Sequence, residues 1–449
     1  MNNFFAAFAQ LMWGPWLLVL LLGTGFWLTI RLRGIQFRSL FYALRLTFSK
    51  ERQGQGDISH FSSLMTALAA TVGIGNIAGV STAVALGGPG AIFWMWVTGL
   101  VGMATKYSEG FLAVKFRRVN DKGEISGGPM YYLEEGVKNK WLAMSFAVFG
   151  ACAAFGIGNM VQANTTATAL KETIGLNSVT IGMFLAILTG MVVIGGIKRI
   201  SEVASYLVPF MVAIYFSGAL IVIFKHLDQL GAGIKLVFEH AFSGTAATGG
   251  FVGASLANCI RYGVARGLFS NESGMGSAPI VAAAARTNHP SKQALVSMTG
   301  TFIDTLIVCS VTAMAISSTG VWTSGETGVA LTIQAFTAGL PGYWGKLLVT
   351  LGTITFAFST ILAWEYYGEK CFEYISGGKY ILLYRYAWVI FVFIGAQVKL
   401  DLVWNISDAM NALMAIPNLI GLIFLSGVLF RETKAYEIGI RDGSIGKFD

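Results

Sequence analysis

Thr71-Val72-Gly73-Ile74-Gly75-Asn76 interrupts a hydrophobic run long enough to cross a membrane, and Gly267-Leu268-Phe269-Ser270-Asn271-Glu272-Ser273-Gly274-Met275-Gly276-Ser277 interrupts a second one. Glycine loosens a helical backbone, and the polar side chains lie at a depth where no water is available. Peptide groups that are freed there must bind something. A pair of broken membrane helices is typical of secondary transporters.

The composition predicts an all-α polytopic membrane protein. Of the 449 residues, 55% are hydrophobic and 12% are charged, against roughly 25% charged in an ordinary soluble domain. The mean hydropathy is +0.64. The first residues, Met1 to Phe5, carry no lysine or arginine, so we expect the first hydrophobic run to stay in the protein rather than to be removed as a signal peptide.

A membrane-spanning helix needs about 20 mainly apolar residues, and on this rule we predict eleven spans. They cover residues 12–31, 61–86, 89–116, 141–170, 177–196, 202–225, 248–283, 294–318, 344–370, 380–397 and 402–430. The spans at 61–86 and 248–283 are the two that contain the interruptions. The second is long enough to hold two half-helices with an unwound middle.

The basic residues predict the orientation, because lysine and arginine collect on the cytoplasmic side. With the N-terminus outside and the C-terminus in the cytoplasm, the external segments keep Lys171, Lys225, Lys235, Lys346 and Lys399, while most of the other lysines and arginines fall inside. The net charge of +8 is then a product of membrane topology. We therefore expect a multi-pass protein of the cell membrane, with the lipid bilayer and not nucleic acid as its partner.

The spacing of the two breaks predicts an inverted repeat. Five spans run from the first broken helix to the second, and five run from the second to the end, so the two broken helices cross the membrane in opposite directions. We divide the chain into an extra N-terminal helix with a basic segment (1–60), a first five-helix repeat (61–240), a second inverted repeat (241–430) and a cytoplasmic tail (431–449).

The first break admits three interpretations. Gly73, Gly75 and Gly79 resemble a dinucleotide-binding loop, but the flanking segments are membrane helix rather than the βαβ unit that such a loop requires. A helix contact through small residues is the structural alternative. We favour a ligand site, in which Gly73 and Gly75 offer backbone N–H groups to a carboxylate while Thr71 and Asn76 offer oxygen to a cation.

At the second break Glu272 requires an explanation, because a carboxylate inside a membrane costs at least about 2.5 kcal/mol unless it is paired or hydrated. Arg261 and Arg266 precede it on the same segment, so a structural ion pair is one explanation. A cation or proton site is the other. Asp304 lies in the middle of a later span and is a second candidate for an ion or proton site.

Further intramembrane polar groups are Gln162 and the adjacent hydroxyls Ser359 and Thr360, which are hard oxygen donors of the kind that alkali cations prefer. Four cysteines and four histidines are scattered, so the sequence supports neither a zinc site nor a haem site and no cofactor. The scattered histidines also disfavour a membrane enzyme, and the clustering of polar groups at two breaks disfavours an ion channel.

Two motifs carry a family resemblance. The segments Gly87-Gly88-Pro89-Gly90-Ala91-Ile92-Phe93-Trp94-Met95-Trp96 and 265–279 resemble those of the alanine or glycine:cation symporter family. The resemblance covers essentially the whole chain. It implies symport of a small neutral amino acid, alanine or glycine, with sodium or less often protons. It also implies the leucine-transporter-type fold, whose ten core helices form two inverted five-helix repeats and leave the first span here as an extra helix.

The resemblance also assigns residues. Residues 70–76 are similar to the unwound Asn-Ala-Val-Gly-Leu-Gly-Asn signature of the wider superfamily. The implied sodium ligands are Ala69, Thr71, Val72, Asn76, Ser270, Ser359 and Thr360. The implied substrate contacts are Thr71, Gly73, Gly75, Asn76, Phe269, Ser270 and Trp364, to which we add Gln162. Thr71 and Glu272 depart from the superfamily pattern, so the number and coordination of the ions stay open.

We therefore predict a symporter, not an enzyme, that couples inward sodium movement to uptake of alanine or glycine by alternating access. A proton-coupled symporter of small amino acids is the alternative. The sequence leaves open the preferred enantiomer, the stoichiometry and the oligomeric state, for which a monomer is the simplest expectation.

Overall fold

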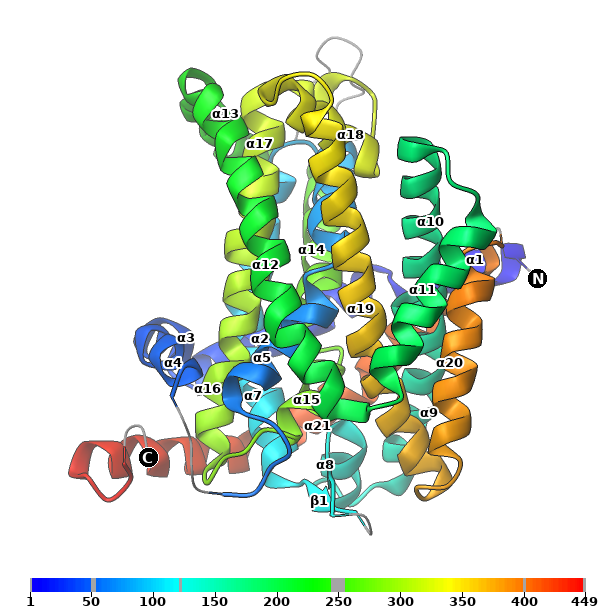
Figure 1. Cartoon of the computed structure of the whole chain (residues 1–449). Coiled ribbons are helices and arrows are strands. Elements are labelled where there is room, and N and C mark those ends of the chain that lie inside the picture. Colours follow the sequence, from blue (N-terminus) through cyan, green and yellow to red (C-terminus); the bar gives the residue numbers. More distant parts are fainter. Residues whose placement is uncertain (1, 50–53, 121–122, 244–254, 399–400, 447–449) are drawn as a thin grey trace.

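The computed structural model describes residues 2–49, 54–120, 123–243, 255–398 and 401–446, and these residues are mainly helical (Figure 1). The α-helices are α1 (Asn2–Met12), α2 (Pro15–Arg31), α3 (Ile35–Arg38), α4 (Leu40–Thr47), α5 (His60–Thr71), α6 (Val80–Gly87), α7 (Ala91–Lys115), α8 (Pro129–Glu135), α9 (Lys140–Ala153), α10 (Val161–Ile174), α11 (Ser178–Val193), α12 (Gly196–Lys225), α13 (Leu227–Ser243), α14 (Leu256–Asn271), α15 (Ala278–Ala283), α16 (Pro290–Thr301), α17 (Ser310–Thr319), α18 (Gly328–Gly339), α19 (Trp344–Ser376), α20 (Ile381–Gly395) and α21 (Asp401–Asp442).

Three helices widen into π-helical segments, which are η1 (Gly75–Gly79), η2 (Ala154–Met160) and η3 (Phe302–Cys309), and η4 (Val321–Thr323) is a short 3₁₀ turn. Such π-helical turns are often found at functional sites. The strands β1 (Arg118–Val119) and β2 (Ile125–Ser126) form a small antiparallel hairpin, with Arg118 opposite Ser126 and Val119 opposite Ile125.

Within the described part of the chain, six helical stretches are long and apolar enough to cross a membrane, or seven if the bent pair α5 and η1–α6 is counted as one span. The protein is therefore an integral membrane protein. Helices also occupy the other predicted spans, namely α7, α11, α14 with α15, and α20. Residues 248–254 of the predicted span 248–283 lie outside the described residues. The count of eleven spans stays a prediction.

The first predicted break is confirmed. Helix α5 ends at Thr71, Val72 leaves the helical region with φ −74° and ψ 84°, and the helices on either side are bent by 53°. Gly73 allows α19 to approach closely, because a Cβ at this position would lie 2.8 Å from Thr360 Oγ1. The absence of a side chain therefore lets the freed backbone pack directly against a neighbouring span.

The second break is also confirmed. Helix α14 ends at Asn271, and the chain turns through left-handed conformations at Glu272, Gly274 and Gly276, with φ of 53°, 87° and 85°. Glycine adopts positive φ without steric cost, whereas glutamate does so rarely. Helix α15 then begins at Ala278. Glu272 is thus held in an unfavourable backbone conformation within a buried turn.

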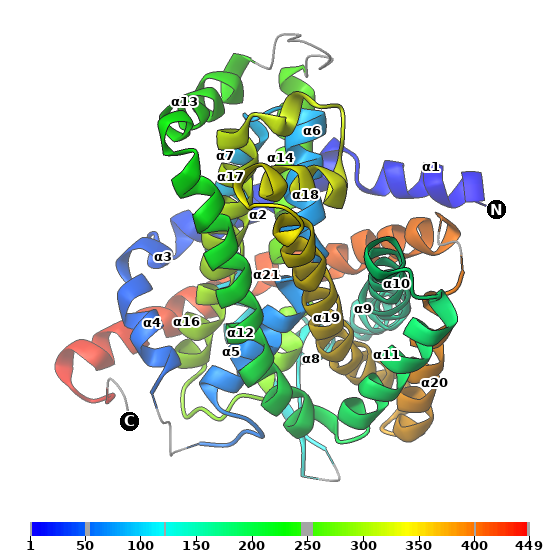
Figure 2. The same cartoon turned by 45° about the horizontal axis from the view of Figure 1, so that its top comes forward.

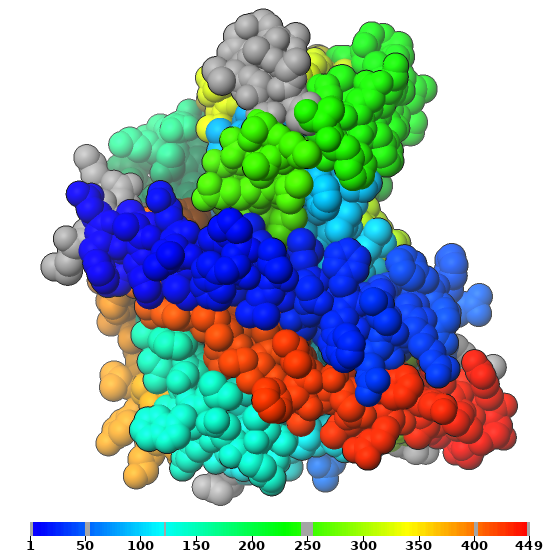
Figure 3. All heavy atoms as spheres, turned by 180° about the vertical axis from the view of Figure 1, so that it is seen from behind, coloured from blue at the N-terminus to red at the C-terminus, as the bar shows by residue number. Residues whose placement is uncertain are grey.

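The helices fall into two groups on either side of α19 (Figures 1 and 2). Helix α19 packs against α12 on one side and against α10, α9 and α20 on the other. Seen from behind, the N-terminal helices α1 and α2 lie along α21 (Figure 3). Helix α7 packs against α14 and α16, so both the second break and the Asp304 helix have α7 as a neighbour.

Candidate ion and substrate site

The two breaks face each other. A Cβ at Gly75, in η1, would lie 3.2 Å from Ser270 Cα and 3.4 Å from the Phe269 ring. The unwound turn of the first broken helix therefore packs tightly against the end of α14 at Gly75. This contact brings together the residues around Asn76 and around Ser270, which the sequence placed on two separate spans.

Asp304 is the centre of this contact. It lies in η3 and is completely buried. Its Oδ1 accepts a hydrogen bond from Asn76 Nδ2 at 2.8 Å, and its Oδ2 accepts from Ser270 Oγ at 2.9 Å and from Thr305 Oγ1 at 2.7 Å. Cys309 Sγ lies 3.2 Å from both Asn76 Nδ2 and Ser270 Oγ. A buried carboxylate is thus surrounded by neutral polar groups from three spans.

Asn76 links this carboxylate to the backbone of the first break. Its Oδ1 accepts a hydrogen bond from Gly73 N at 2.9 Å while its Nδ2 donates to Asp304. The amide of Gly73, which we expected to bind a substrate carboxylate, is therefore engaged by the side chain that we expected to bind sodium. The Asn76 side chain therefore contacts both the Gly73 N–H and the Asp304 carboxylate.

A second set of hydroxyls lies where α19 crosses α5. Ser359 Oγ and Thr360 Oγ1 donate to the Ala69 carbonyl at 3.1 and 3.2 Å, and Thr360 Oγ1 lies 3.5 Å from the Ala70 carbonyl. Val72 follows the end of α5 and is buried. The structure thus brings Ala69, Ser359 and Thr360 together as hard oxygen donors.

Thr71 does not join the Asp304 group. Its hydroxyl donates to the Ala67 carbonyl of its own helix at 3.1 Å. The residue lines a small cavity of ≈ 20 Å³ that Lys106 and Asn271 also line. The extra hydroxyl relative to the superfamily signature therefore points to the α7 side of the first broken helix.

Glu272 contacts neither predicted arginine. Its Oε2 accepts from Ser277 Oγ at 2.5 Å and its Oε1 accepts from Trp364 Nε1 at 3.1 Å. Arg261 and Arg266 instead line a separate cavity of ≈ 240 Å³ that also contains Asp408. The interpretation of Glu272 as half of an ion pair with arginine is therefore wrong for the described contacts.

The cation that lies beside the second break is Lys106, from α7. Its Nζ donates to the Glu272 carbonyl at 3.2 Å, and the residue is only 4% exposed. Glu109, one turn further along α7, accepts from Gly276 N at 3.1 Å and from Asn418 Nδ2 at 2.7 Å. The sequence analysis did not single out these two residues, although both lie inside the predicted span 89–116.

Trp364 connects the second break to η2. A Cβ at Gly158 would lie 2.3 Å from Trp364 Cβ, so α19 and η2 are in direct contact there. Gln162 follows at the start of α10, where its Nε2 donates to the Ile157 carbonyl at 2.9 Å and its Oε1 has no hydrogen-bond partner among the described residues. Phe269 lies under the Arg266 guanidinium, 5.8 Å from its ring centre.

Comparisons with known proteins agree with this architecture. The chain is 52% identical over 434 residues to the sodium/alanine symporter AgcS of Methanococcus maripaludis, covering 94% of each chain. It is 48% identical over 437 residues to an uncharacterized transporter of Haemophilus influenzae, covering 97% of this chain and 96% of the relative.

The crystal structure of MhsT in complex with L-phenylalanine superposes with a TM-score of 0.59 at 13% identity, covering 83% of this chain and 90% of MhsT. This similarity shows the fold alone, and it agrees with the expected leucine-transporter type. The family described as "Sodium:alanine symporter family" matches residues 1–449. The relatives and the family are transporters, so the protein is not an enzyme. The chain belongs to the sodium:alanine symporter family.

Proposed function

We propose that the protein couples inward movement of sodium to uptake of alanine, with glycine as a second substrate, and that Asp304 is the carboxylate of the coupling-ion site. The observation that carries this proposal is the contact of Asp304 with Asn76 and Ser270, one from each broken helix. The Asp304 carboxylate and the Ser270 and Thr305 hydroxyls beside it are the hard oxygen ligands that an alkali cation prefers.

The contact between Gly73 and Asn76 supports a coupling step. In the structure, Asn76 Oδ1 accepts from Gly73 N. When a sodium ion takes that amide oxygen as a ligand, the Gly73 N–H is released and is free to donate to a substrate carboxylate. Gly75 then provides a second N–H beside it. Sodium binding thereby prepares the anion site, and the ion's charge lowers the cost of burying the carboxylate.

Ala69, Val72, Ser359 and Thr360 are proposed to hold a second sodium ion between α5 and α19. The support is the approach of two hydroxyls to the Ala69 carbonyl. Thr71 is retained as a sodium and substrate ligand only if its hydroxyl turns away from the Ala67 carbonyl. Its position beside Lys106 makes it the least supported of the proposed ligands.

Trp364 is proposed to form the wall that limits the substrate side chain, with Phe269 and Gln162 as neighbouring contacts. Its indole is fixed on one side by Glu272 and on the other by the close approach of Gly158. A fixed, bulky wall excludes larger side chains by steric clash. Without such a wall, one extra methylene changes the binding free energy by only about 1 to 3 kcal/mol. Glu272 therefore acts here by holding Trp364.

The proposed architecture is eleven spans, with residues 61–240 and 241–430 as two inverted five-helix repeats, 1–60 as the extra N-terminal helix and 431–449 as a cytoplasmic tail. The N-terminus lies outside. Alternating access follows when one group of helices rocks against the other around the site between the breaks. Movement of one net positive charge inward gains about 2.3 kcal/mol per 100 mV, or roughly fiftyfold accumulation.

Uptake of labelled alanine into proteoliposomes tests this function. We expect uptake when sodium is outside and none when choline replaces it. The buried carboxylates Asp304 and Glu272 also suit a proton-coupled symporter, and uptake driven by a proton gradient without sodium would favour that alternative. Uptake that ignored both gradients would exclude symport.

A further inference from the structure

The C-terminal half of α19 holds a group of buried charges that lies outside the proposed site. Glu365, Glu369, Lys370 and Glu373 are 0%, 3%, 2% and 7% exposed, and Arg385 of α20 joins them. Three acids and two bases thus occupy the interface of α19 with its neighbours. The sequence analysis did not single out these acids, because Glu365 and Glu369 lie near the end of the predicted span 344–370 and Glu373 lies beyond it.

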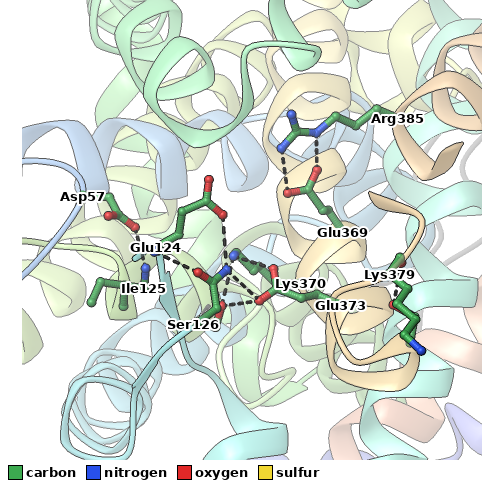
Figure 4. Close-up of polar contacts among 11 residues, drawn as sticks. Asp57, Glu124, Ile125, Ser126, Glu369, Lys370, Glu373, Lys379 and Arg385 are labelled. Atoms are coloured by element: carbon green, nitrogen blue, oxygen red, sulfur yellow. Dashed lines mark hydrogen bonds and ion pairs between the residues drawn. The ribbon is translucent and has the colours of Figure 1, made fainter. Parts of the chain in front are cut away.

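Each of the two cations already has an acidic partner (Figure 4). Arg385 contacts both oxygens of Glu369, with Nε to Oε2 at 2.5 Å and Nη2 to Oε1 at 3.0 Å. Lys370 Nζ donates to Glu373 Oε2 at 2.7 Å and to Ser126 Oγ at 3.0 Å. The two pairs leave Glu365 as the acid without a cation of its own.

Neither oxygen of Glu365 receives a hydrogen bond from a donor among the described residues. Glu369 follows four residues later on α19, and residues at this spacing are neighbours on the same face of a helix. Two ionised carboxylates are both acceptors and cannot bond to each other. A hydrogen bond between them requires that one of the two carries a proton, and Glu369 is the one that Arg385 holds ionised.

We propose that Glu365 is a proton-binding site. In the folded transporter its carboxyl group keeps the proton and donates a hydrogen bond to the Glu369 carboxylate. A buried carboxylate without a partner is costly, and such a group becomes neutral instead. Sodium fits this position less well, because an alkali cation needs several oxygen ligands and the acid one helical turn away, Glu369, is already held by Arg385.

The groups that face this position agree with a neutral acid. Glu369 and Lys370 come from its own helix, and Tyr384 and Arg385 come from α20. Gly368 makes room for Tyr384, because a Cβ there would lie 2.0 Å from the tyrosine hydroxyl. The only cations in this set are the two that are already paired.

The group of buried charges borders a cavity on the side of Arg385. A cavity of ≈ 750 Å³ is lined by Arg385, Glu373 and Ser126, and the Arg385 side chain is 16% exposed. The proton on Glu365 prevents it from competing with Glu369 for Arg385. Loss of that proton places two like charges one turn apart on α19, which weakens the contact of α20 with α19. This role does not depend on which substrate is transported.

Infrared difference spectra of the full-length protein at pH 7 test the proposal. The spectrum of the wild type minus that of E365Q should show the C=O stretch of a protonated carboxyl. The matched control is E239Q, an acid whose side chain is 53% exposed, and its difference spectrum should show an ionised carboxylate. An ionised carboxylate in the E365Q difference, or a band that shifts when choline replaces sodium, would overturn the proposal.

A second variant and a second measurement give independent results. In E369Q, Arg385 is released to pair with Glu365, so Glu365 should become ionised. The C=O stretch of its protonated carboxyl should then be absent from the spectrum of E369Q. A stretch that persisted in this variant would contradict the proposal. Above the pH at which the unfolded chain loses this proton, the native wild type still holds it. The wild type should therefore lose about tenfold in its folding equilibrium constant per pH unit relative to E365Q. Parallel pH profiles of the two proteins would also contradict it.

Discussion

Asn76 Nδ2 lies 2.8 Å from Asp304 Oδ1, although the two residues are 228 positions apart in the chain. This hydrogen bond joins the first broken helix to the span that carries the buried acid. Because Asn76 also accepts from Gly73 N, it connects a carboxylate, an amide oxygen and a backbone N–H in one chain of contacts. An ion that changes one of these bonds changes the others.

The Asn76→Ala substitution removes the hydrogen bonds of this side chain with Gly73, Asp304 and Cys309. We expect sodium-dependent alanine binding to be lost while the protein stays folded, because the amide oxygen that links the ion to the Gly73 N–H is gone. Equilibrium binding of labelled alanine measures this. Thr82→Ala is the control, since the Thr82 hydroxyl bonds only the Ala78 carbonyl of its own segment. Unchanged binding in the Asn76 variant would show that the ion lies elsewhere.

Asp304→Asn keeps the shape of the side chain and removes its charge. A hydrogen bond to a charged group is worth about 1.5 to 3 kcal/mol, so the apparent sodium affinity should fall by about 10- to 150-fold. The sodium concentration for half-maximal alanine uptake reports this change. Thr305→Val removes a neighbouring hydroxyl without removing the charge and should have a smaller effect. Equal sodium dependence in Asp304→Asn and wild type would remove Asp304 from the site.

Trp364 is tested by two substitutions with different consequences. Trp364→Ala removes the proposed wall, so amino acids larger than alanine should compete for uptake. Trp364→Phe keeps a ring but loses the hydrogen bond from Nε1 to Glu272, so it should preserve the size limit and weaken substrate binding. Competition assays with a series of unlabelled amino acids measure both. If selectivity were the same in all three proteins, Trp364 would have only a packing role.

Gly158→Ala should destabilise the contact of η2 with α19, because the new Cβ would lie 2.3 Å from Trp364 Cβ. Overpacking of this kind typically costs about 1 to 3 kcal/mol. Gly79→Ala is the matched control, since Gly79 also lies in a π-helical segment and a Cβ there meets nothing within 4 Å. Thermal unfolding of the two variants in detergent compares them. Equal unfolding temperatures would mean that the helices separate easily at Gly158.

Lys106 and Glu272 form a pair for a double-mutant cycle. Lys106→Met removes the buried charge beside the second break and the donor to the Glu272 carbonyl. Glu272→Gln removes the acid but keeps an acceptor for Trp364. Residues in one network show coupling energies of about 0.5 to 3 kcal/mol, so the double variant should be more stable than the sum of the single effects predicts. Additive effects on unfolding would place Lys106 outside the Glu272 network.

The two breaks were predictable because glycine and polar residues at bilayer depth have few alternative explanations. The meeting of Asn76, Ser270 and Asp304 was not predictable from spacing, since the three residues lie on different spans and only the packed helices bring them together. The family resemblance assigned roles to Asn76 and Ser270, but it did not place Asp304 or Cys309 between them.

The arginine partner of Glu272 was the clearest error. Arg266 and Arg261 lie 6 and 11 residues before Glu272, which suggested that all three share one helix. However, α14 ends at Asn271 and the helical periodicity stops there. Glu272 then turns toward α7 and α19, where Lys106 and Trp364 lie. Glu365 was overlooked for a different reason, because it lies near the end of its predicted span rather than in the middle, where Asp304 lies.

Thermodynamic linkage between sodium and alanine tests the central claim most directly. If Asn76 couples the ion to the Gly73 N–H, sodium must raise the affinity for alanine, and alanine must raise the affinity for sodium by the same factor. Titration calorimetry on the purified protein, with each ligand added in the absence and in the presence of the other, measures both factors. We predict two equal factors greater than one. An alanine affinity that is the same in sodium and in choline would contradict the proposed site.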